Sequence, residues 1–133
     1  MEIEINNYRK ILSVQDAFTS FFPFLHLGFY ERPGKQGQLS KRIVQNTQKT
    51  IGECRSVYNA GLISISRKMN ISELKQKFRE GYGLYIDVFK KTGNSSLDRV
   101  PVQEENALEN VNGEIESLKS FHHSTENDER KND

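Results

Sequence analysis

The sequence contains no tryptophan, only three prolines and a single cysteine, Cys54, among its 133 residues. One cysteine excludes an internal disulfide framework and fits a reducing compartment. The N-terminal Met-Glu-Ile-Glu-Ile-Asn lacks the basic region and apolar run of a secretory signal. No stretch approaches the roughly 18 apolar residues that a membrane span requires. These absences predict a cytoplasmic protein with no membrane partner.

Charge is nearly balanced overall but unevenly distributed. Residues 31–79 hold eleven Lys or Arg against three Glu, whereas residues 98–133 hold ten acidic residues against four basic ones. The segment 122–133 has no apolar side chain, so it cannot bury enough surface to offset the entropy of ordering. We therefore expect a single domain over residues 1–121, followed by a disordered tail.

The apolar positions of the sequence repeat once along the chain. With an offset of sixty, residues 2–22 match residues 62–82 in their apolar positions, and with an offset of fifty-nine residues 25–29 match residues 84–88. In each half, alternating apolar residues predict a strand, apolar residues at helical spacing predict a helix, and a second alternating strand follows. Pro23 and Gly83 mark the ends of the two helices.

Two strand–helix–strand halves predict an α+β domain with the ferredoxin-like order βαββαβ. The right-handed crossover rule makes the two strands of each half parallel within one mixed sheet of four to five strands. Residues 31–60 are then an insertion between the halves, and a short strand near 97–102 adds the fifth strand. Residues 104–119 form a C-terminal helix with an apolar stripe at Leu108, Val111, Ile115 and Leu118.

The expected helices have recognisable start signals. A capping residue followed three positions later by an acidic one lets each side chain satisfy a free backbone N–H of the other. Three such pairs are present: Ser13 with Asp16, Asn70 with Glu73, and Thr50 with Glu53. The first two predict helices that begin near residues 14 and 71. Inside the insertion, Ser40 and Thr50 predict one or two short helices over 41–58, ended at Gly61.

Several phrases resemble a family of small uncharacterised bacterial α/β proteins. They are Phe-Pro-Phe-Leu-His-Leu-Gly-Phe at 22–29, Thr-Ile-Gly-Glu-Cys-Arg at 50–55, Ile-Ser-Glu-Leu-Lys-Gln-Lys-Phe at 71–78 and Gly-Leu-Tyr-Ile-Asp-Val-Phe at 83–89. The resemblance implies a shared domain and no assigned activity. The chain departs from the family after the turn near residue 93, where relatives carry a tryptophan.

Candidate catalytic and metal-binding residues are few. Cys54 has no histidine close to it in sequence to hold it as a thiolate, and the remaining candidates, His26, His122 and His123, lack metal-ligand spacing. We expect no metal, no cofactor and no enzymatic activity. An enzyme with an unfamiliar site remains a third, weaker hypothesis.

Four aromatic residues are expected on the open face of the sheet: Phe24, Tyr30, Tyr85 and Phe89. Apolar patches of this kind mark interfaces. The C-terminal helix either covers this face within the same chain, which is favoured, or meets it in a homodimer. The pattern predicts a non-catalytic interaction module that binds a protein partner or self-associates.

The alternative function is nucleic-acid binding through the basic insertion 31–55. Its candidate phosphate contacts are Arg32, Lys35, Lys41 and Arg42. The usual mode of a ferredoxin-like sheet stacks bases on aromatics of the central strands. Here Glu2 and Glu4 are expected on that surface and repel a phosphate backbone, so nucleic acid is the disfavoured partner.

Overall fold

The computed structural model describes residues 1–31, 42–91, 99–101 and 105–113, with the backbone alone at residue 91 and 99–101. Its elements, in chain order, are β1 (Glu2–Ile5), α1 (Ile11–Phe21), β2 (Leu25–Phe29), the 3-10 helix η1 (Ile51–Cys54), β3 (Gly61–Ser64), α2 (Ile71–Tyr82), β4 (Ile86–Lys91) and β5 (Arg99–Pro101). A further helical turn covers 108–113. The α+β class and the two strand–helix–strand units are confirmed.

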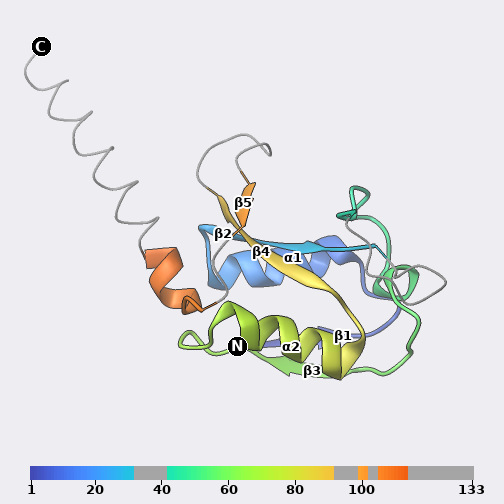
Figure 1. Ribbon diagram of the computed structural model, residues 1–133. Helices are drawn as coiled ribbons and strands as arrows, with labels where there is room; N and C mark the ends of the chain where they lie inside the picture. The colour runs from blue at the N-terminus through green and yellow to red at the C-terminus, as the bar shows by residue number, and fades with distance from the viewer. Residues whose placement is uncertain (32–41, 92–98, 102–104, 114–133) are drawn as a thin grey trace, which may run out of the picture.

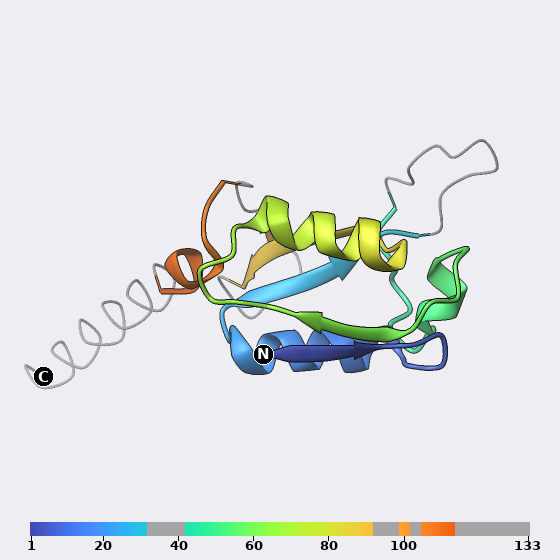
Figure 2. The same cartoon turned by 90° about the horizontal axis from the view of Figure 1, so that it is seen from below.

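The strands do not form the expected single mixed sheet. β1 pairs with β3 in one sheet, β2, β4 and β5 form a second sheet in that order, and all of these pairs are antiparallel. The two sheets face each other, and α1 and α2 lie on opposite sides of them (Figures 1 and 2). The predicted parallel pairing within each half is therefore wrong, because each strand pairs with its counterpart from the other half.

The physical reason is the shared core. The alternating apolar residues of both sheets point inward: Ile3, Ile5, Ile63 and Ile65 from one sheet, and Leu25, Leu27, Phe29, Leu84, Ile86 and Val88 from the other. Val14 and Phe18 of α1, with Leu74 and Phe78 of α2, close the sides. Two-residue periodicity identifies the buried face of a strand, but it does not identify the neighbouring strand.

The strand registers relate the two halves by a pseudo-two-fold axis. Glu2 pairs with Ser64 and Glu4 pairs with Leu62, so a shift of sixty exchanges one pair for the other. Leu27 pairs with Val88 and Phe29 pairs with Ile86, which are exchanged by a shift of fifty-nine. These are the two offsets at which the sequence repeats.

The correspondence extends beyond the strands. The amide of Ile51 at the start of η1 donates to the carbonyl of Arg9 at 2.8 Å, and the amide of Leu108 donates to the carbonyl of Met69 at 2.9 Å. Arg9 and Met69 are again sixty residues apart. Part of the segment between the halves thus matches part of the segment that follows the second half.

The two long helices begin differently. The Asn70 side chain accepts a 2.8 Å bond from the amide of Glu73, which confirms the predicted cap of α2. The predicted cap of α1 at Ser13 is wrong, because α1 already begins at Ile11 after an N-cap residue, Lys10, whose side chain makes no capping bond. Backbone carbonyls of residues 47 and 49 accept the first two amides of α1 instead.

The C-terminal helix is described only over 108–113, and the rest of the expected range 104–119 lies outside the described residues. Leu108 and Val111 are buried in the common core, and the Asn112 side chain accepts a 2.9 Å bond from the amide of Phe24. The described part of this helix therefore folds back onto its own chain. Within the described residues, no helix is long and apolar enough to cross a membrane.

Candidate functional site

The predicted aromatic face is present in part. Alternation along β2 and β4 places Tyr30, Tyr85 and Phe89 on the face of their sheet that points away from the core. Tyr30 and Tyr85 are half-buried, but Phe89 is only 6% exposed. Phe24 lies before β2 and packs against the edge of the core. The four side chains therefore do not form one exposed aromatic surface.

A glycine and a carboxylate shape this outer face. A Cβ built on Gly28 would lie 2.6 Å from the Phe89 ring, so the ring occupies the space beside the glycine backbone. The Tyr30 hydroxyl donates to Asp87 Oδ2 at 3.2 Å. Burial, followed by the negative charge and hydrogen bond of Asp87, raises the pKa of Tyr30. Tyr30 thus stays a protonated donor at neutral pH.

The predicted basic cluster is only partly described. Arg32, Lys35 and Lys41 lie outside the described residues, and Arg42 is exposed. Arg55, which belonged to the same basic segment, is 1% exposed and belongs to the interior. Of the four candidate phosphate contacts only Arg42 is described, so the basic surface stays a prediction.

Arg55 instead ties three chain segments together. Its Nε donates to Asn7 Oδ1 at 2.8 Å, its Nη1 donates to the carbonyl of Tyr82 at 2.9 Å, and its Nη2 donates to the carbonyl of Asn59 at 2.7 Å. Burial lowers the pKa of this guanidinium from its ordinary value. The arginine fixes the end of α2 relative to the loop after β1 and the segment before β3.

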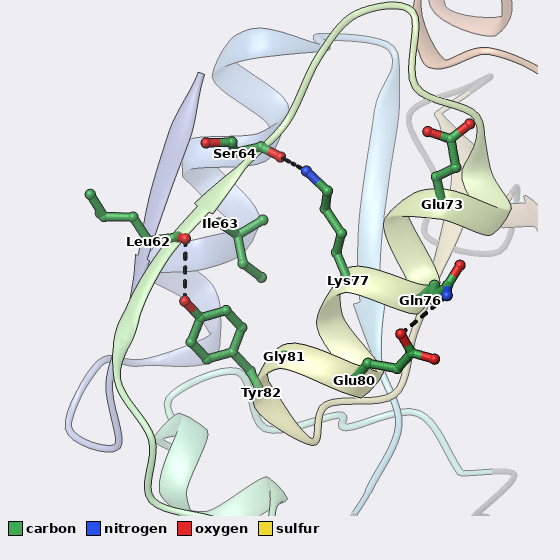
Figure 3. Close-up of a pocket in the computed structure, with 9 residues that line it drawn as sticks. All are labelled: Leu62, Ile63, Ser64, Glu73, Gln76, Lys77, Glu80, Gly81 and Tyr82. Carbon is green, nitrogen blue, oxygen red and sulfur yellow. Dashed lines mark hydrogen bonds between the residues drawn. The ribbon is translucent and has the colours of Figure 1, made fainter.

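A groove of about 670 Å³ lies between β3 and α2, shown in Figure 3. Leu62–Ser64 line it from β3, and Glu73, Gln76, Lys77 and Gly81 with its neighbours Glu80 and Tyr82 line it from α2. We call this the β3–α2 groove. Ile63 is buried at its floor, whereas Leu62 beside it is 58% exposed.

One wall of the groove is the outer edge of β3, with which no other strand of the described residues pairs. Met1 and Ile65 exchange two main-chain hydrogen bonds, at 2.9 and 2.8 Å. Bonded and non-bonded residue pairs alternate along an antiparallel ladder, so Leu62 and Ser64 are in non-bonded pairs with β1. Their main-chain N–H and C=O groups therefore point away from β1 and toward the groove.

Two side chains of α2 reach across the groove to this edge. Lys77 Nζ donates to the carbonyl of Ser64 at 2.9 Å, and the Tyr82 hydroxyl donates to the carbonyl of Leu62 at 3.2 Å (Figure 3). Both bonds are exposed to solvent, where an intramolecular hydrogen bond adds only about 0.5–1.5 kcal/mol. The outward carbonyls are thus satisfied by groups that another donor can replace at low cost.

A second, smaller hollow of about 400 Å³ is lined by Glu31, Val44, Lys49, Glu53 and Cys54. Cys54 is 3% exposed and its thiol is not in a disulfide. Among the described residues no three His, Cys, Asp or Glu side chains are grouped closely enough to hold a metal ion.

Comparison with known protein families, curated proteins and solved structures finds no match to this chain. The resemblance to a bacterial family therefore stays a prediction.

Two weak signals for the groove are present in the sequence, and neither is part of the aromatic-face hypothesis. Leu62 is an apolar residue at an outward position of a strand whose other outward residue is Ser64. Glu73, Lys77 and Glu80 share one side of α2, because residues three and four apart are neighbours on a helix. Their meeting depends on the placement of α2 beside β3, which the sequence did not reveal.

Proposed function

We propose that this protein is a non-catalytic interaction module that binds an extended segment of a partner protein along the edge of β3. The observation that carries the proposal is the outward edge of Leu62 and Ser64 lining the β3–α2 groove. An extended peptide beside such an edge forms main-chain hydrogen bonds and adds a strand to the sheet.

Exchange of hydrogen bonds makes the addition feasible. An incoming strand would donate to the carbonyls now bonded to Lys77 and Tyr82, and it would accept from the outward amides of Leu62 and Ser64. The displaced lysine has Glu73 and Glu80 four and three residues away on the same side of the helix, so its ammonium group can pair with either carboxylate. The bonds that Lys77 and Tyr82 give up are both exposed, so water can satisfy either group after displacement.

Leu62 adds an apolar contact. Its side chain is 58% exposed beside the groove, and a neighbouring apolar side chain of the added strand would cover it. Full burial of a leucine stabilises by about 1.5–3 kcal/mol, so covering the exposed part contributes about 1 kcal/mol.

The test is an amide-resolved NMR titration of the full chain with a neutral nine-residue peptide centred on Thr-Val-Gln-Val-Thr. Strand addition predicts chemical-shift changes centred on Leu62 and Ser64. The variant Lys77→Ala with Gly81→Phe gives α2 the residues found at the equivalent positions of α1, Ala17 and Phe21, and should abolish the changes. Arg79→Ala changes an α2 residue that does not line the groove, so this variant should show the same chemical-shift changes as the unmodified protein.

Three outcomes would overturn the proposal. Shifts confined to other residues would place binding elsewhere. Concentration-dependent shifts at Leu62 and Ser64 without peptide would make a second copy the occupant. Shifts at Arg42 and Lys49 with an oligonucleotide, and none with the peptide, would favour the nucleic-acid alternative.

A further inference from the structure

We infer that the segment recognised by the β3–α2 groove is basic, with Lys or Arg side chains at alternating positions. This inference rests on the proposed strand addition and names the chemistry of the partner. The evidence is the distribution of charge on two surfaces beside an added strand: the α2 wall of the groove and the outer face of the β1–β3 sheet.

The α2 wall of the groove is acidic on balance. Glu73, Lys77 and Glu80 line the groove, which leaves two carboxylates against one ammonium group. At 100° per residue, Lys75 and Arg79 lie on the opposite flank of α2, beyond the residues buried in the core. The basic residues of α2 are therefore largely kept away from the groove.

The face of the β1–β3 sheet that points away from the core is acidic as well. Glu2 lies opposite Ser64, and Glu4 lies opposite Leu62, both exposed on the surface that faces away from the core. Side chains alternate between the two faces of a strand. An added strand next to β3 would thus direct one set of side chains toward Glu73 and Glu80, and the other set toward the side that carries Glu2 and Glu4.

Lys77 strengthens the preference once it is displaced. In the unbound protein its ammonium group bonds to the Ser64 carbonyl. After strand addition it stays within reach of Glu73 and Glu80 and neutralises one of them, so one carboxylate remains for the partner. A basic side chain of the partner meets that carboxylate, whereas an acidic one would be repelled.

The inference is tested with three nine-residue peptides of equal length. Each has the same Thr and Val positions, and each carries Lys, Gln or Glu at two alternating sites. The full chain is titrated with each peptide and the shifts of the Leu62 and Ser64 amides are followed. The expected order of affinity is Lys over Gln over Glu, with the difference falling as salt rises because exposed charges are screened.

Glu73→Gln combined with Glu80→Gln should weaken binding of the Lys peptide about threefold, since the exposed ion pair with the carboxylate that Lys77 leaves free is lost, and leave the Gln peptide unchanged. The matched control is Asp16→Asn, which removes one exposed carboxylate from α1 on the other half of the molecule. This control should leave the affinity for all three peptides unchanged.

Equal affinity for the three peptides, or a preference for the Glu peptide, would overturn the basic preference and leave strand addition standing. Failure of every peptide to shift the Leu62 and Ser64 amides would overturn both the proposed function and this inference.

Discussion

The two halves share one backbone plan, but one half closes the space that the other leaves open. α1 packs against both β1 and β2, whereas α2 packs mainly against β4. At the positions of α1 that correspond to Lys77 and Gly81 of α2 stand Ala17 and Phe21, both partly buried against the core. Lys77 and Gly81 do not fill the space that Ala17 and Phe21 fill in the first half, and a groove is present there instead.

The aromatic contacts of the first half show how the closure is stabilised. The rings of Phe21 and Phe22 meet edge to face at 4.8 Å, and the guanidinium of Arg67 lies 4.3 Å from the centre of the Phe21 ring. Such contacts add to the apolar burial. In the second half, Tyr82 stands in place of Phe22 and uses its hydroxyl on a strand carbonyl instead. The equivalent positions of the two halves thus make different contacts: ring packing in the first half and a hydrogen bond to a strand in the second.

Replacing Arg55, which holds the end of α2 in the second half, should have the largest effect on the free energy of unfolding. Arg55→Ala removes the hydrogen bonds that hold the end of α2 and leaves a cavity, so we expect a loss of about 3–5 kcal/mol in the free energy of unfolding. Urea denaturation followed by circular dichroism measures it. Arg79→Ala, at an exposed position, should change the same quantity by less than about 0.5 kcal/mol. Similar losses for the two variants would contradict the structural role of Arg55.

A pair of glycines at the end of α2 gives the next effect. Gly83 has a φ of +64°, and an added Cβ would lie 2.7 Å from Val57 Cγ2, so Gly83→Ala should destabilise by at least about 1–2 kcal/mol.

Gly81 is the matched control in the same turn. An added Cβ meets nothing within 4 Å, so Gly81→Ala should stabilise by about 0.5–1 kcal/mol through its higher helix propensity. Thermal unfolding of the two variants measures the difference. The same sign for both would show that the end of α2 differs from this description.

The smallest effect concerns the two helix starts. Asn70→Ala removes a side-chain cap and should cost about 1 kcal/mol. Ser13→Ala removes only an exposed side-chain bond from Arg9, because backbone carbonyls of residues 47 and 49 already satisfy the start of α1, so it should cost less than about 0.5 kcal/mol. Chemical denaturation of both variants decides the point. An equal loss would mean that the two helices start alike.

Local patterns predicted much of the fold. The strands, α2 with its Asn70 cap and the short helix after Thr50 lie where alternation, helical spacing and capping residues placed them. Helical spacing also placed α1, but this helix begins at Ile11, before the predicted start. The Ser13 cap failed because the partner of the first α1 amides is a backbone segment about 35 residues away, and no local pattern encodes such a contact.

The candidate site was less predictable. Tyr30, Tyr85 and Phe89 share a face as alternation required, but the burial of Phe89 depends on its contact with Gly28 across the sheet. Arg55 is a charged residue in a basic segment, and its sequence surroundings do not show that Asn7, Asn59 and Tyr82 converge on it. The groove exists because α2 packs against β4 and leaves a space beside β3, and no local sequence pattern encodes this packing.

By itself, the sequence determined the order of the elements, the buried face of each strand and the repeat at sixty and fifty-nine residues, because side-chain period and backbone conformation are local. The tertiary structure alone decided that the strands pair between the halves and that the two sheets share one core. It also decided that β3 has an edge beside α2 with which no other described strand pairs. These features follow from which apolar faces meet, and residues far apart in the chain make that choice together.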